Sequence, residues 1–197
     1  REMILRALSL LALLCVAPAA RAVECSDLSY AGNRYTLCEV DASKEQLRLF
    51  LRDDKAQIFG HFSSIEESLA AEGKTLAFAT NGGMYHANRS PVGLYIEQGQ
   101  EEMRLIPNAG PGNFGLLPNG VFCLREGRAD VIETLAYRDS GMACASATQS
   151  GPMLVIDGAL HPRFLPGSTS YYIRNGVGTS RDGRRVVFTI SRNAVNF

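Results

Sequence analysis

Pro118-Asn-Gly-Val-Phe-Cys-Leu-Arg-Glu-Gly-Arg-Ala-Asp-Val-Ile-Glu-Thr134 indicates what class of fold this chain adopts. Two short segments rich in apolar and β-branched residues, 121–125 and 129–134, lie on either side of a turn that contains Gly. Strand-forming segments separated by a few such residues are typical of a β-hairpin. The preceding Pro118-Asn-Gly120 is a second turn signal, so we predict another strand at 113–117 and three consecutive antiparallel strands.

The rest of the chain continues this strand-rich pattern and contains few helical segments. Capping signals at Ser63 and Ser64 predict one short helix that ends near Ala71. The segment 137–147 fits either a short helix or a loop. Apolar or alternating runs predict further strands at 35–40, 46–51, 75–80, 92–97, 152–156, 159–161 and 186–190. We therefore predict an α+β fold: a strand-rich single domain with antiparallel or mixed sheets and a few flanking helices.

The composition is that of a folded protein without a strongly charged partner. The chain has 197 residues, of which 46% are hydrophobic, and this is enough to bury one core. Lys and Arg together number 20, as do Asp and Glu, so the formal net charge is zero. Proteins that bind nucleic acid usually carry a basic excess, and we expect no nucleic-acid partner here.

The first 22 residues have the pattern of a cleaved export signal. Basic residues flank the start of an apolar run, which ends at the small-x-small pattern of Ala20 and Ala22. The run is shorter than the ~20 residues that cross a bilayer as a helix. We predict cleavage after Ala22, with an uncleaved anchor as the alternative. The domain then spans residues 23–197, has no stable membrane span, and lies in the periplasm or outside the cell.

Removal of residues 1–22 leaves four cysteines, Cys25, Cys38, Cys123 and Cys144. An even number in an exported chain predicts two disulfides, and four cysteines allow three pairings. We favour the most local one, Cys25 with Cys38 and Cys123 with Cys144. No Cys-x-x-Cys is present and the three histidines are scattered, so we expect neither a metal site nor a cofactor.

Asn81-Gly82-Gly83 follows the predicted strand at 75–80 and is the first candidate site. Two consecutive glycines let the chain turn sharply and let a ligand approach the backbone closely. Asn81 would present one donor and one acceptor at the end of the strand. The alternative is a simple turn at the end of a strand.

Gln149 and Ser150 form the second candidate site, at the start of another apolar segment. Ser150 lacks the Gly two positions earlier that a nucleophile elbow requires, because Thr148 stands there. A serine hydrolase centred on Ser150 is therefore a minor alternative. We expect both side chains to hydrogen-bond a polar ligand or to cap a turn.

Arg174 precedes Gly176 and Gly178, which predict a glycine-rich turn, and this is the third candidate site. A guanidinium group donates two parallel hydrogen bonds to a phosphate or a carboxylate, and nearby backbone N–H groups assist. The alternative is an arginine that pairs with a surface carboxylate, which is common and contributes little to stability.

Six motifs between about Thr75 and Phe197 together resemble bacterial members of the phosphodiester glycosidase family. They are Phe78-Ala-Thr-Asn-Gly-Gly-Met-Tyr-His86, Ser90-Pro-Val-Gly-Leu-Tyr95, Gly112-Asn-Phe114, Pro118-Asn-Gly-Val-Phe122, Ala147-Thr-Gln-Ser-Gly-Pro-Met-Leu-Val155 and Ile173-Arg-Asn-Gly-Val-Gly178. The resemblance implies hydrolysis of a sugar phosphodiester at the glycosidic C–O bond. The implied substrate is an envelope polysaccharide or another glycan.

The resemblance also implies roles for the candidate residues. Arg174 would hold the phosphodiester and stabilise the departing phosphate. Asn81 would act beside it and bind the sugar or a phosphate oxygen. The substrate-binding residues that we predict are Gly82, Gly83, Gln149, Ser150, Gly178 and Thr179. At Thr179-Ser180 the sequence departs from a lysosomal relative, which carries a His-Asp pair there.

One further departure concerns the end of the chain. Family members carry a Leu-Asp-Gly-Gly-like turn that does not occur before Phe197. We therefore expect a C-terminally truncated domain whose catalytic carboxylate lies beyond residue 197, and a chain without that carboxylate would be inactive. The rival function is a non-catalytic module that binds glycan or envelope on the same fold.

Overall fold

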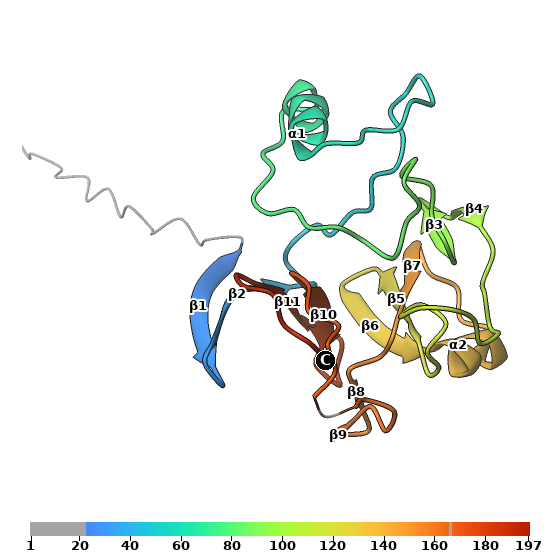
Figure 1. The fold of residues 1–197 in the computed structure, drawn as a ribbon. Coiled ribbons are helices and arrows are strands. Elements are labelled where there is room, and N and C mark those ends of the chain that lie inside the picture. Colours follow the sequence, from blue (N-terminus) through green and yellow to red (C-terminus); the bar gives the residue numbers. More distant parts are fainter. Residues whose placement is uncertain (1–22, 166) are drawn as a thin grey trace, which may run out of the picture.

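Two antiparallel sheets form the frame of the computed structural model, which describes residues 23–165 and 167–197 (Figure 1). The predicted export signal at 1–22 lies outside the described residues. Within the described ranges every strand pair is antiparallel and two helices are present, so the predicted α+β class is confirmed. No helix in these ranges is both long and apolar enough to cross a membrane.

The four-stranded sheet brings together segments from both ends of the described chain. Its strands, in spatial order, are β1 (Glu24–Tyr30), β2 (Asn33–Asp41), β11 (Arg185–Ser191) and β10 (Asn175–Thr179). β2 pairs with β11 although about 150 residues of sequence separate them, with Val40 opposite Val186. The predicted strands at 35–40 and 186–190 are confirmed.

The five-stranded sheet contains the hairpin that the sequence indicates most clearly. Its strands, in spatial order, are β4 (Gln100–Met103), β3 (Tyr95–Glu97), β7 (Ser146–Ser150), β5 (Gly120–Arg125) and β6 (Arg128–Glu133). β5 and β6 pair along their full length around Gly127, whose φ is +64°. The hairpin over 121–134 is therefore confirmed, and β7 is its neighbour on the other side.

Three smaller elements complete the fold. They are α1 (Phe62–Ala71), α2 (Thr134–Ser140) and a short hairpin of β8 (Val155–Ile156) with β9 (Ala159–Leu160). α1 confirms the predicted helix and lies away from the sheets at the top of Figure 1. The ambiguous segment 137–147 divides into the end of α2, a connecting loop and the start of β7.

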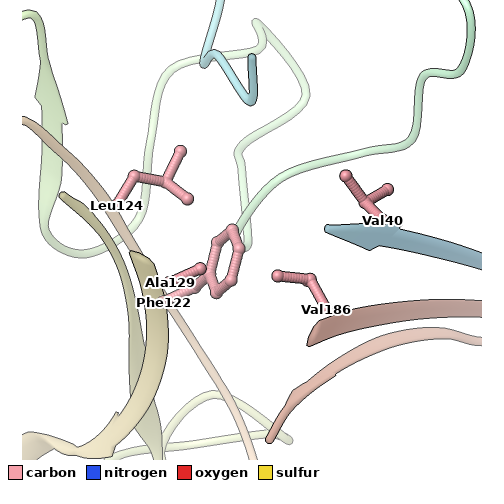
Figure 2. Packing of buried hydrophobic residues seen from close by; sticks show 5 residues of the cluster. All are labelled: Val40, Phe122, Leu124, Ala129 and Val186. Carbon is pink, nitrogen blue, oxygen red and sulfur yellow. The ribbon is translucent and has the colours of Figure 1, made fainter. Parts of the chain in front are cut away.

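The main core lies where the two sheets meet. Phe122 of β5 packs with Val40 of β2 and Val186 of β11, and Figure 2 shows its ring extending toward Val186. Val186 is completely buried, and Phe122 is 9% exposed. A second cluster on the opposite face of the five-stranded sheet includes Val121 and Ala147, and Tyr137 of α2 covers it. The sheets are therefore held together chiefly by burial of apolar area.

Both favoured disulfides are present. Cys25 of β1 bonds to Cys38, which stands directly opposite in the β1–β2 pairing. Cys123 of β5 bonds to Cys144, which lies in the loop before β7. The local pairing predicted from the sequence is therefore confirmed.

Three predicted strands are wrong, because they contain extended or looped chain with no ladder partner. In the segment 113–117, Gly115 packs against the backbone of Gly110 so closely that no Cβ fits, which leaves a compact loop. Segments 46–51 and 75–80 have no strand or helix assigned. Their apolar side chains line a cavity between the sheets. Of these two segments only Leu51 is buried, so an apolar run by itself establishes neither a buried strand nor a paired backbone.

Candidate functional site

A cavity of about 1320 Å³ lies between the two sheets and collects most of the predicted site residues. Those that line it are Asn81, Gly82, Gly83, Ser150, Arg174, Gly178 and Thr179. They come from the segment after residue 80, from the end of β7 and from β10 and its approach. Only Gln149 of the predicted set does not line this cavity. Residues from three motifs that are far apart in sequence thus line the same cavity.

The turn at Asn81 is attached to β7 by backbone groups of the two residues that follow Gly82. Gly83 N–H donates to Thr148 Oγ1 at 3.0 Å, and Met84 N–H donates to the Gln149 carbonyl at 3.4 Å. A Cβ on Gly83 would overlap Thr148 Oγ1 and the Gln149 carbonyl. Gly83 is therefore required for close approach to β7.

The side chain of Asn81 is exposed on the cavity wall. Within the described part of the chain no protein group hydrogen-bonds its amide. One N–H₂ donor and one carbonyl acceptor are thus available to a ligand with hydroxyl or phosphate oxygens.

Arg174 reaches the cavity with a charge that no carboxylate neutralises among the described residues. Its Nε donates to the Val195 carbonyl at 3.0 Å, and Nη2 donates to the Ser170 carbonyl at 2.7 Å. Its guanidinium carbon lies 3.7 Å from the ring centroid of Phe197. Burial lowers the pKa of Arg174 below its ordinary value. An arginine side chain is a cation at neutral pH.

These contacts fix the orientation of the guanidinium and leave part of it free. Nε and Nη2 have protein partners, whereas no described residue accepts a hydrogen bond from Nη1. The two carbonyl acceptors orient the group without cancelling its charge. Part of the guanidinium therefore stays unengaged, and the alternative of a surface ion pair is not observed among the described residues.

The glycines after Arg174 do not form the predicted turn. Gly176 and Gly178 lie in β10 and pair with Thr189 and Val187 of β11. β11, an apolar strand, pairs with the glycine segment as its neighbour in the sheet. Local turn propensity alone does not predict this pairing. Thr179, at the end of β10, accepts a hydrogen bond from Val131 N–H at 3.2 Å and so connects β10 to β6.

Gln149 is a buried structural amide. Its Oε1 accepts from the backbone N–H of Leu94 at 3.1 Å and of Ile106 at 3.0 Å. Its Nε2 donates to the Ile106 carbonyl at 2.7 Å and to Thr134 Oγ1 at 3.2 Å. With 1% of its surface exposed and both amide atoms engaged, Gln149 supports the loops behind the cavity.

Ser150 is exposed at the end of β7 and pairs with Gly120. In the described ranges no histidine hydrogen-bonds its hydroxyl. His161, the most buried histidine, uses Nδ1 to accept from Arg163 N–H at 3.1 Å. A base that activates Ser150 is therefore not observed, and the hydroxyl is available as a donor and acceptor for a ligand.

Two residues that sequence analysis did not select stand out in the structure. Asn175 donates from Nδ2 to Thr80 Oγ1 at 3.2 Å and to the Asn81 carbonyl at 3.5 Å. Its position directly after Arg174 was the signal that could have identified it. Glu97 is a half-buried carboxylate that accepts from Tyr95 Oη at 2.8 Å and from Leu51 N–H at 3.0 Å.

Burial dominates the titration of Glu97 and raises its pKa above the ordinary 4.5. Tyr95, its phenol partner, is 7% exposed and lines the cavity. Burial first, and then its hydrogen bond to Glu97, raise the pKa of Tyr95. No group of three or more His, Cys, Asp and Glu suited to a metal ion was found in residues 23–165 and 167–197.

Comparisons with known proteins agree on one family. Residues 74–196 match the model of the family described as Phosphodiester glycosidase, and this range contains every candidate site residue. The chain is also similar to a protein of Escherichia coli (strain K12) that bears the name Uncharacterized protein YigE. The two are 34% identical over 193 residues, which cover 97% of this chain and 72% of the relative.

Proposed function

The chain belongs to the phosphodiester glycosidase family, and on that premise we propose that it is an exported hydrolase of sugar phosphodiesters. The family supports a glycosidase-type hydrolase activity and a glycan substrate. We further propose that the bond cleaved is the glycosidic C–O bond and that the substrate belongs to an envelope polysaccharide or another glycan. We propose that residues 23–197 belong to the phosphodiester glycosidase-like domain.

The observation that carries this proposal is that Arg174 and Asn81 line the same cavity, and that Asn175, the residue after Arg174, donates to the Asn81 carbonyl at 3.5 Å. Arg174 offers a fixed cation without a carboxylate partner among the described residues, and Asn81 offers an unengaged amide. A phosphodiester carries one negative charge, and the sugar attached to it carries hydroxyl groups. The two side chains therefore match the two halves of the substrate.

In the proposed reaction, the oxygen of a water molecule bonds to the anomeric carbon while the bond from that carbon to the phosphate oxygen breaks. The electron pair leaves with the phosphate, which becomes a monoester, and the proton from water is released to solvent. Arg174 stabilises the negative charge that grows on the departing phosphate. A fixed donor of this kind contributes ~3–4 kcal/mol to transition-state stabilisation.

The other residues act at the rim and behind the wall. We propose that Ser150, Gly178 and Thr179 bind either the sugar or the group on the other side of the phosphate. Gly82 contributes its backbone beside Asn81, and Gly83 holds that backbone on β7. We assign Gln149 a supporting role, because its amide is already fully engaged.

The proposed location is the periplasm or the cell exterior. Two disulfides are consistent with an oxidising compartment, since cytosolic thiols are usually kept reduced. We propose that residues 1–22 direct export and are removed.

The test is an assay of the full-length gene product with α- and β-linked sugar 1-phosphodiesters, including an N-acetylglucosamine phosphodiester. Free sugar and phosphomonoester are both measured. Arg174→Ala is expected to reduce turnover at least ~100-fold, which corresponds to ~2.7 kcal/mol. Arg192→Ala is the matched control, because Arg192 pairs with Asp27 on the four-stranded sheet and does not line the cavity.

Failure of the wild type to release sugar from every compound in the panel would reject the enzymatic function. Binding of the same protein to a glycan array would then favour the non-catalytic module. Labelling of Ser150 by a serine-reactive phosphonate would instead support the serine hydrolase, which predicts that Arg174→Ala leaves the labelling intact.

A further inference from the structure

The segment that presents Asn81 is held by few backbone hydrogen bonds. Residues 75–83 belong to no helix or sheet. On one side, Gly83 N–H and Met84 N–H attach the turn to β7. A segment outside any sheet is positioned by the few groups that contact it. The other hydrogen bonds to this segment therefore determine the position of Asn81.

The second anchor comes from β10. Asn175 is the first residue of this strand and stands opposite Ile190 of β11. Its Nδ2 donates to Thr80 Oγ1 at 3.2 Å and lies 3.5 Å from the Asn81 carbonyl oxygen. The contact joins residues that are 94 positions apart in the sequence.

The backbone from which Asn175 projects is itself well fixed. Arg174 N–H donates to Ser191 Oγ at 2.9 Å, and Ser191 N–H donates to the Arg174 carbonyl at 2.8 Å. Ser191 is 3% exposed, so water does not compete for these bonds. The amide of Asn175 therefore extends from a rigid strand toward a segment that has no sheet of its own.

We propose that Asn175 is a positioning residue that sets the Asn81 turn against Arg174. It is adjacent to Arg174 in the chain and bonded to the backbone at Asn81, so it links the two side chains that the proposed function requires. This inference rests on that proposed function for its catalytic consequence. The positioning itself is a property of the fold and has its own test.

An asparagine suits this task because its short side chain carries a donor with few rotatable bonds. Asn175→Ala removes the donor. Asn175→Asp keeps the shape and loses the donor to the Asn81 carbonyl, but the Thr80 hydroxyl can donate to the new carboxylate. Neither change alters the backbone pairing of β10 with β11.

The first measurement is hydrogen exchange of the backbone amides of Gly83 and Met84 by NMR. Asn175→Ala is expected to speed their exchange at least ~10-fold, because the turn then opens more often on one side. Asn175→Asp is expected to speed it less, because the Thr80 hydroxyl can donate to its carboxylate. Asn33→Ala is the matched control, since Asn33 accepts from Asn193 Nδ2 at 2.7 Å on the same sheet, away from the cavity. It is expected to leave both amides unchanged.

The second measurement uses a sugar phosphodiester that the wild type hydrolyses. Asn175→Ala is expected to lower kcat roughly 10- to 100-fold, as misplacement of a catalytic group by about 1 Å does. In the Asn81→Ala background the same change is expected to have no further effect, because Asn175 acts through Asn81. Thermal unfolding checks that the variants remain folded.

Unchanged exchange at Gly83 and Met84 in both Asn175 variants would overturn the inference. So would multiplicative losses of kcat in the Asn81→Ala/Asn175→Ala double variant, because these would show that the residues act independently. If the wild type hydrolyses nothing but exchange is accelerated, the proposed function fails and the positioning stands. If Arg174→Ala abolishes turnover while Asn175→Ala changes neither exchange nor kcat, only this inference fails.

Discussion

At the scale of single residues, Gly83 is a glycine of the cavity wall that has no room for a side chain. A Cβ there would overlap atoms of Thr148 and the Gln149 carbonyl, and the carbonyl belongs to a strand that cannot move aside. Gly83→Ala is expected to cost about 1–3 kcal/mol in the free energy of unfolding, because backbone must shift to accept the methyl group. Denaturant unfolding measures this cost.

Gly82→Ala is the matched control for that prediction. The nearest atoms to a Cβ on Gly82 are the Thr148 side chain at 3.9 Å, which is ordinary contact. Equal loss of stability in the two variants would contradict the assignment of Gly83 as a close-approach residue.

Glu97 gives a prediction about pH. Its folded-state pKa is raised above 4.5, so the folded protein binds more protons than the unfolded chain over the interval between those two values. The contribution of Glu97 to stability is therefore fully present below pH 4.5 and falls as pH rises through the folded-state pKa. Glu97→Gln is expected to remove this fall.

The measurement is the free energy of unfolding of the wild type and Glu97→Gln from pH 4 to pH 8. Asp41 and Asp130, with lowered pKa values, contribute changes of opposite sign that are common to both proteins and cancel in the difference. A difference that does not vary with pH would refute the raised pKa of Glu97.

At the scale of elements, the two disulfides stabilise different parts of the fold. Cys123–Cys144 links β5, at the centre of a sheet, to the loop before β7 and closes a sequence separation of 21 residues. Cys25–Cys38 links an outer strand to its neighbour over 13 residues, and every residue of β1 is exposed. The first is expected to matter more for global stability.

The Cys123→Ser/Cys144→Ser variant is expected to lose about 2–5 kcal/mol of unfolding free energy, and the Cys25→Ser/Cys38→Ser variant less. The reason is that two serines at the buried pair would leave polar hydroxyls in an apolar cluster. Chemical unfolding of both variants under oxidising conditions measures the costs. A larger loss at the Cys25–Cys38 pair, of which Cys38 is buried and Cys25 exposed, would contradict this ranking.

At the scale of the whole molecule, the site depends on two sheets meeting. Arg174 precedes a strand of the four-stranded sheet, whereas Ser150 ends a strand of the five-stranded sheet. The Phe122 cluster and the bond between Val131 and Thr179 hold the sheets in contact. Changes in this core therefore alter the relative placement of residues from opposite walls of the cavity.

The sequence by itself determined the class of fold and its most local features. The hairpin over 121–134, the helix ending at Ala71 and both disulfides follow from interactions between residues close in the chain. Local periodicity, turn residues and short cysteine spacing carry that information. The motifs around Asn81 and Arg174 were visible for the same reason.

Only the tertiary structure decided how the candidate residues divide between cavity and scaffold. Gln149 and Ser150 are neighbours with similar hydrogen-bonding capacity, yet Gln149 lies in the buried part of β7 and Ser150 is exposed at its end. Gly176 and Gly178 became strand because β11 lay beside them. Asn175 acquired its partner from 94 residues away. Such outcomes depend on contacts between distant segments, which no local pattern encodes.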